Sequence, residues 1–107
     1  MDTVTLFDTR RLLQQEPGLT VIETLPDEFY DEFHLPGAKN VPLDDRFEES
    51  ARRVAPDPSK PVLVYGLDRK SDAPVKAAQR LERLGYARVY VFPGGKIEWK
   101  ENGLATE

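Results

Sequence analysis

The sequence predicts an α/β protein with a central, twisted parallel sheet and helices on both of its faces. Three short apolar segments rich in β-branched residues, at 19–24, 62–65 and 89–92, are typical of buried strands. Amphipathic segments with helical spacing of their apolar residues separate these strands. Because alternating strands and helices fold into parallel sheets, this class is favoured. The 107 residues fit one domain, 1–107.

The first half of the chain is expected to form short elements joined by turns. Asp8 is the expected N-cap of a helix, which Pro17 and Gly18 end. Pro26 opens a short helix whose acidic first turn suits the helix dipole. The expected elements are a strand at 4–6, a helix at 9–15, a strand at 19–24, a helix at 27–33, an extended segment at 40–42 and a helix at 44–54.

The second half contains the clearest strand. Segment 62–65 is entirely apolar apart from the tyrosine hydroxyl, as a central parallel strand should be. A helix over 73–84 follows, with Asp72 as its expected N-cap and Gly85 at the position after its end. Strand 89–92 and a last short helix complete the chain. The expected centre of the core is Ile22, Val64, Val75, Ala78, Leu81 and Val91.

The composition narrows the function classes. A formal net charge of −4 and a pI near 5.1 disfavour nucleic acid, which needs a basic protein face, and equally an anionic membrane surface. No apolar run approaches the roughly 20 residues that cross a bilayer, and residues 1–5 lack a signal-peptide pattern, so a cytoplasmic protein is expected. With no cysteine and one histidine, neither a metal site nor a cofactor is expected.

A polar loop follows strand 62–65 and is the main candidate site. Backbone N–H groups at the start of a helix converge on one point, where the helix dipole favours negative charge. Arg69 and Lys70 add cations, which predicts a small oxyanion as ligand. The opposite interpretation is a solvated loop, because Asp68 and Asp72 offset those cations. The candidate anion-binding residues are Gly66, Leu67, Asp68, Arg69, Lys70, Ser71 and Asp72. Gly66 also permits unusual backbone dihedrals or the close approach of a ligand.

Other ionisable residues have structural interpretations that we favour over catalytic ones. His34 is expected to form hydrogen bonds within a turn rather than to act as a catalyst. Glu23 lies at a strand end, and together with Asp27 or Glu28 it could supply a carboxylate pair for acid–base catalysis. The structural interpretation is better, because Asp27 and Glu28 suit the first turn of a helix.

Five segments, in order and at matching spacing, resemble the rhodanese-like domain family over essentially the whole chain. Segment 34–42, His-Leu-Pro-Gly-Ala-Lys-Asn-Val-Pro, matches the family's His-hydrophobic-Pro-Gly-Ala-x-Asn-hydrophobic-Pro motif almost letter for letter. Segment 93–99 matches its Gly-Gly-x-x-x-Trp ending. The other similar segments are 21–30, 64–65 and 77–86. The resemblance implies the parallel-sheet fold, with an active loop at a strand's carboxyl end. The implied activity is sulfane-sulfur transfer through a cysteine persulfide.

The chain departs from this family at the atoms that carry its chemistry. Gly66 stands where the resemblance places the nucleophilic cysteine, and Ser71 where one subgroup has a second cysteine. Glu23 and Leu25 replace a usual Asp and Arg. Persulfide formation requires a thiolate, whereas the only sulfur here is the thioether of Met1. We therefore predict a non-catalytic module that binds a small anion or a protein partner through the loop face. The alternative is an enzyme, a sulfurtransferase-family member whose cysteine is absent from this chain.

Overall fold

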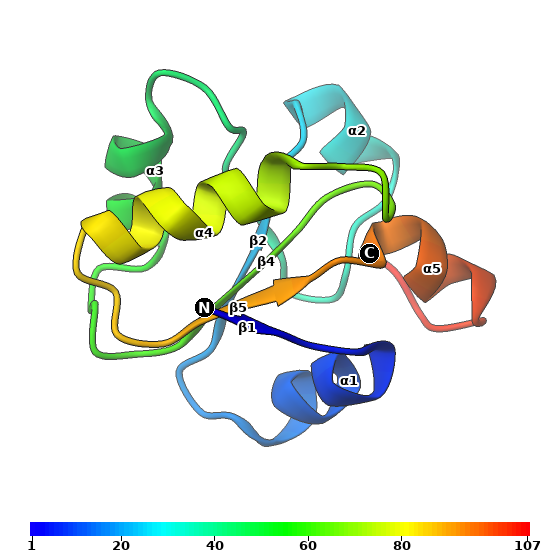
Figure 1. Cartoon of the computed structure of the whole chain (residues 1–107). Helices are drawn as coiled ribbons and strands as arrows, with labels where there is room; N and C mark the ends of the chain where they lie inside the picture. The colour runs from blue at the N-terminus through cyan, green and yellow to red at the C-terminus, as the bar shows by residue number, and fades with distance from the viewer.

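Five parallel strands form the central sheet of the computed structural model, which describes residues 1–107 (Figure 1). The strand order is β1-β5-β4-β2-β3, so β4 lies in the middle between β5 and β2. All four residues of β4 are buried, as expected for a central strand. The strands are β1 (Asp2–Thr3), β2 (Thr20–Glu23), β3 (Lys39–Asn40), β4 (Val62–Tyr65) and β5 (Val89–Phe92). This sheet confirms the predicted α/β class.

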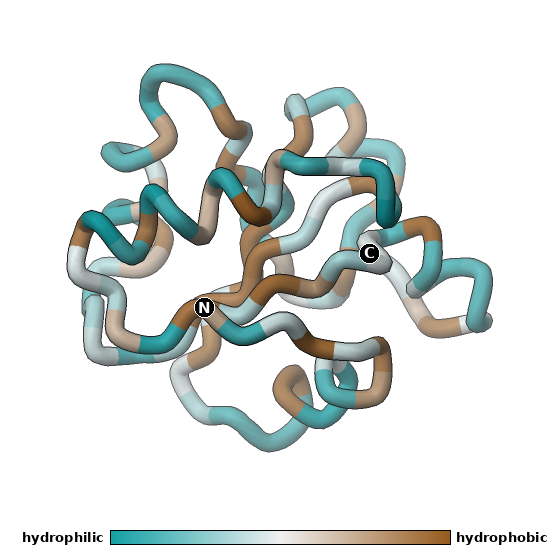
Figure 2. Tube along the Cα trace, in the orientation of Figure 1, coloured by the Kyte–Doolittle hydropathy of each residue, from teal (hydrophilic) through white to brown (hydrophobic).

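Helices cover both faces of the sheet, as Figure 1 shows for α4 on one side and α1 on the other. Successive strand side chains point to opposite faces, so Val62 and Val64 pack with α3 and α4, whereas Leu63 and Tyr65 pack with α1 and α5. Figure 2 shows the apolar residues gathered along the central strands. The helices are α1 (Leu6–Gln15), α2 (Asp27–Glu32), α3 (Phe47–Val54), α4 (Ala73–Arg83) and α5 (Gly95–Glu101). None of them has both the length and the apolar content that a membrane crossing requires.

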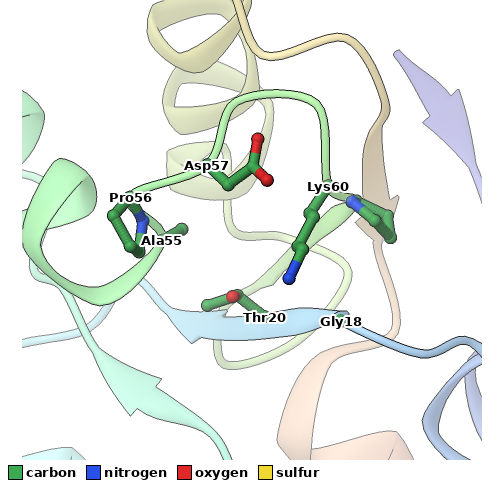
Figure 3. A pocket seen from close by; sticks show the side chains of 7 residues that line it. Gly18, Thr20, Ala55, Pro56, Asp57 and Lys60 are labelled. Carbon is green, nitrogen blue, oxygen red and sulfur yellow. The ribbon is translucent and has the colours of Figure 1, made fainter.

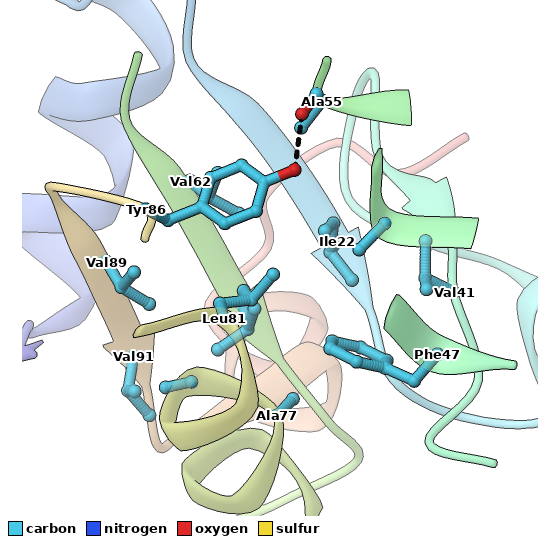
Figure 4. Packing of buried hydrophobic residues seen from close by; sticks show 13 residues of the cluster. Ile22, Val41, Phe47, Ala55, Val62, Ala77, Leu81, Tyr86, Val89 and Val91 are labelled. Atoms are coloured by element: carbon cyan, nitrogen blue, oxygen red, sulfur yellow. Dashed lines mark hydrogen bonds between the residues drawn. The ribbon is translucent and has the colours of Figure 1, made fainter. Parts of the chain in front are cut away.

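The larger hydrophobic cluster contains every predicted core residue except Val75 (Figure 4). Val75 is 43% exposed, whereas Leu81 on the same helix is fully buried. The prediction for Val75 was wrong because residues three apart are rotated by about 300° rather than a full turn. A series of residues at this spacing therefore moves around the helix by about 60° at each step and leaves the buried face. The buried face of α4 instead follows the i, i+3, i+4, i+7 pattern of Pro74, Ala77, Ala78 and Leu81.

The start of the chain also differs from the prediction. Helix α1 begins at Leu6, and Thr5 rather than Asp8 is its N-cap. The two side chains form a capping box, in which the Asp8 N–H donates to Thr5 Oγ1 at 3.1 Å and the Thr5 N–H donates to Asp8 Oδ2 at 3.3 Å. The expected strand at 4–6 is therefore replaced by β1 and this cap. Helix α1 thus begins three residues earlier than predicted, whereas helix α3 begins three residues later, at Phe47.

Candidate functional site

The candidate loop, residues 66–72, connects the carboxyl end of β4 to α4, as the sequence predicts. Gly66 is buried, and it is not among the glycines with a positive φ, so unusual dihedrals do not explain this glycine. Space is limited there instead. A Cβ on Gly66 would lie 3.1 Å from Cγ of Pro74 and 3.3 Å from Cβ of Ser71. The position expected to hold a nucleophile is thus a tight contact between the strand end and α4.

Hydrogen bonds within the loop use some of its backbone N–H groups and leave others free. The Ser71 N–H donates to the Asp68 carbonyl at 3.1 Å, and the Asp68 N–H donates to Ser71 Oγ at 3.4 Å. The Lys70 N–H donates to Asp68 Oδ1 at 3.0 Å. The remaining loop N–H groups, which donate to no protein acceptor, are those of Gly66, Leu67, Arg69 and Asp72.

The charges of the loop are partly neutralised by neighbouring helices. Arg69 donates to Glu98 Oε1 of α5 through Nε at 3.2 Å and through a terminal nitrogen at 2.8 Å. Asp72 is the N-cap residue of α4, as predicted, but its side chain pairs with Lys76 at 3.1 Å and makes no capping hydrogen bond. Lys70 is exposed and makes no ion pair. A shallow pocket of about 310 Å³ beside these charges is lined by Asp68, Arg69, Lys70, Gly94, Ile97, Glu98 and Glu101.

The first turn of α5 holds the loop backbone in place. The Lys96 N–H donates to the Gly66 carbonyl at 3.1 Å, and the Ile97 N–H donates to the Leu67 carbonyl at 3.0 Å. Gly95 has a φ of +69°, and a Cβ there would lie 2.6 Å from the Gly66 carbonyl oxygen. Only glycine combines a readily accessible positive φ with the absence of a Cβ, so only glycine fits at position 95. Gly95, the first residue of α5, therefore allows the start of this helix to pack directly on the candidate loop.

A fully buried ionic network lies at the carboxyl end of β2 and β4. Tyr65 donates to Glu23 Oε1 at 2.8 Å, and Lys96 Nζ lies 3.3 Å from Glu23 Oε2. Burial raises the pKa of Glu23 above its ordinary value, although the Tyr65 hydrogen bond and the Lys96 charge oppose this shift. Burial and the adjacent carboxylate raise the pKa of Tyr65 as well, so its hydroxyl keeps its proton and donates. Sequence reasoning missed Lys96, because a lysine in a short helix normally indicates a solvated face.

The other ionisable residues lie in structural positions. Asp27 and Glu28 are exposed on α2, whereas Glu23 is fully buried, so they do not form an acid–base pair. The His34 ring stacks on Tyr30 with centroids 3.8 Å apart, and its Nδ1 lies 2.9 Å from the Tyr30 carbonyl oxygen. The backbone of His34 also pairs with Glu107 in both directions. These contacts agree with the structural role expected for His34.

A second, smaller pocket of about 180 Å³ lies at the amino edge of the sheet, away from the loop (Figure 3). Its ionisable lining residues, Asp57 and Lys60, belong to one turn, and Asp57 accepts hydrogen bonds from Ser59. The Lys60 side chain extends over the chain at Gly18, where a Cβ would lie 3.0 Å from Lys60 Cδ. This pocket contains none of the candidate residues.

Comparison with known proteins identifies the family. The sequence matches the rhodanese-like domain family over residues 5–102. The structure is similar to that of the BH2092 protein from Bacillus halodurans, with a TM-score of 0.86 and 23% identity, covering 99% of this chain and 76% of that one. The rhodanese-like domain of the Alr3790 protein from Anabaena sp. gives a TM-score of 0.83 at 24% identity, covering 100% and 79%. No curated protein matches significantly.

A third similar structure is named as a sulfur transferase. The polysulfide-sulfur transferase homodimer from Wolinella succinogenes gives a TM-score of 0.79 at 25% identity, covering 100% of this chain and 78% of that one. Because the family match spans nearly the whole sequence, this chain belongs to the rhodanese-like domain family. It is a member without any cysteine.

Proposed function

We propose that this chain is a non-catalytic rhodanese-like domain that binds a small oxyanion, such as sulfate or phosphate, at residues 66–72. The observation that carries the proposal is the set of loop N–H groups without a protein acceptor, those of Gly66, Leu67, Arg69 and Asp72. They precede α4, whose dipole favours negative charge at this end. The unpaired ammonium of Lys70 adds an attractive charge.

The expected binding is weak. Arg69 is already engaged by Glu98, and Asp68 and Asp72 repel an anion. A millimolar dissociation constant, equivalent to about −4 kcal/mol, fits such a balance.

The absence of a thiol argues against sulfur transfer. A transferred sulfur atom must form a bond to a sulfur nucleophile, and the chain has no cysteine. The hydroxyl of Ser71 accepts the Asp68 N–H, and the loop has no histidine to act as a base for it. The alternative, a sulfurtransferase whose cysteine has been replaced, requires changes at both Gly66 and Ser71. It draws its support from the name of the similar transferase.

A protein partner on the same face is the second candidate. Phe29 of α2 is 37% exposed and Val75 in the first turn of α4 is 43% exposed. Both residues lie near the carboxyl edge of the sheet, where the loop also lies. Aromatic residues are enriched at protein interfaces, so the exposed Phe29 favours a protein partner over a purely solvated loop face.

The test is a sulfate titration followed by amide chemical shifts, with sodium chloride at equal ionic strength as the control. The largest shifts are expected at the free N–H groups of Gly66, Leu67, Arg69 and Asp72, and smaller ones at Asp68, Lys70 and Ser71. The variant Asp68→Asn removes a repelling charge and keeps the side-chain acceptor, so it should bind sulfate more tightly. The matched control is Asp2→Asn, which changes an exposed carboxylate on the edge strand β1. Shifts spread over the surface would contradict the oxyanion proposal and leave the protein partner.

A further inference from the structure

Helix α2 is attached to the rest of the molecule with little burial of its side chains. None of its residues, Asp27–Glu32, is buried. Tyr30 is half-buried against the smaller hydrophobic cluster, and its hydroxyl donates to the Ala38 carbonyl at 2.6 Å. Because burial of apolar surface supplies most of the stability of a helix in a protein, α2 needs a further source of attachment beyond the partly buried Tyr30.

That attachment is the ammonium group of Lys96, which is 1% exposed and comes from α5. Nζ donates to the Phe29 carbonyl at 2.6 Å and to the Phe33 carbonyl at 2.8 Å, and lies 3.3 Å from Glu23 Oε2. Each of its three protons thus has an acceptor. Carbonyls at a helix C-terminus lack partners within the helix, and a cation is favourable there. The same Nζ lies 4.6 Å from the centre of the Phe33 ring.

The backbone of Lys96 contacts the candidate loop at the same time. Its N–H donates to the Gly66 carbonyl at 3.1 Å, at the position where the family's nucleophile would stand. One residue therefore joins α2 through its side chain to the loop through its main chain. A displacement of Lys96 would therefore change both its side-chain hydrogen bonds to α2 and its backbone hydrogen bond to the loop.

We infer that Lys96 is a positioning residue that fastens α2 to loop 66–72, and that α2 opens as a separate flap when this contact is lost. The sheet and α4 keep their own core, because neither hydrophobic cluster has a buried member in α2. Segments with little buried apolar surface are those that open locally in native proteins. The consequence for anion binding rests on the proposed function, whereas the attachment of α2 does not.

The main test is amide hydrogen exchange in the double variant Glu23→Gln, Lys96→Met. Removing both charges avoids leaving one of them buried and unpaired, which would destabilise the fold by itself. Glutamine retains an acceptor for the Tyr65 hydroxyl. We expect the α2 amides to exchange at least tenfold faster, with unchanged protection in β4 and α4 and altered amide shifts at Gly66 and Leu67. Equal acceleration in α2, β4 and α4 would overturn the inference, as would unchanged exchange in α2.

The matched control is Lys100→Met. Nζ of Lys100 lies 4.5 Å from the centre of the same Phe33 ring, but its side chain is exposed and donates to no α2 carbonyl. This variant should leave α2 exchange unchanged. If the double variant does not fold, native-state exchange of the unaltered chain decides the question. The α2 amides should then open at lower denaturant than those of β4, and opening together with β4 would overturn the inference.

Sulfate binding separates this inference from the proposed function. If the unaltered chain shows no localised sulfate shifts, the oxyanion proposal fails while the exchange result still decides the attachment of α2. If sulfate binds and the double variant binds it as tightly, with altered α2 exchange, Lys96 fastens α2 but does not position the loop.

Discussion

Pro74 packs against Gly66, so that a Cβ on this glycine would lie 3.1 Å from the proline Cγ and 3.3 Å from its Cδ. Since the φ of Gly66 is not positive, a cysteine there meets a tight contact rather than a strained backbone. We expect Gly66→Cys to fold with a loss of about 1 kcal/mol, as modest overpacking costs. Urea unfolding of the variant and the unaltered chain measures this loss.

The thiol of the same variant reports on the loop as an anion site. The start of α4 and the nearby cations should lower its pKa below the free value of about 8.5, while Asp68 and Asp72 limit the shift. The pH dependence of alkylation gives the pKa, with Gln79→Cys on the exposed face of α4 as control. A folded Gly66→Cys whose thiol titrates at or above that of the control would show that the loop does not stabilise an anion.

Two positions on α4 should respond very differently to truncation. Leu81 is fully buried in the larger cluster, so Leu81→Ala should cost roughly 2–5 kcal/mol. Val75 is 43% exposed, and Val75→Ala should change the stability by less than about 0.5 kcal/mol. Denaturant unfolding of both variants tests the helix orientation, which similar losses at the two sites would refute.

The pair formed by Glu48 of α3 and Arg80 of α4 should make stability depend on acid pH. Hydrogen bonds from Arg80 lower the pKa of Glu48 from 4.5 to about 2. Because the folded pKa is below the ordinary one, the contribution is present above pH 4.5 and disappears as pH falls toward 2. Both side chains are partly exposed, so Glu48→Gln should cost only about 0.2–1 kcal/mol at pH 7.

Urea unfolding at pH 7 and at pH 2 checks this pair. The loss caused by Glu48→Gln should be much smaller at the lower pH, where the carboxyl is largely protonated in the unfolded state and partly protonated in the folded state. The control is Glu49→Gln, because Glu49 lies 3.9 Å from Arg53 with both side chains exposed. A loss at pH 2 as large as that at pH 7 would mean that the ion pair is not its source.

Transfer of sulfur from thiosulfate to cyanide should remain at background for the unaltered chain. The covalent step needs a thiol, and none is present. Thiocyanate formation is the measurement, with Gly66→Cys beside it as the variant in which slow persulfide formation is expected. A thiocyanate signal proportional to the concentration of the unaltered protein would refute the proposal that this domain is non-catalytic.

The class of fold and the place of the candidate loop were predictable from the order of residues alone. Segments 62–65 and 89–92 correspond to β4 and β5 residue for residue, because a buried parallel strand requires a continuous apolar run and tolerates few alternatives. The loop follows β4 directly, so its position at the carboxyl edge was predictable from chain order. Its missing thiols are likewise a fact of the sequence.

Which side chains meet one another depends instead on how the elements pack. Arg69 was expected to attract an anion, but α5 brings Glu98 against it. Lys96 is buried because the start of α5 packs on the loop while the end of α2 supplies carbonyl acceptors. These outcomes depend on contacts between segments far apart in the chain, which local patterns of hydrophobicity and charge do not encode.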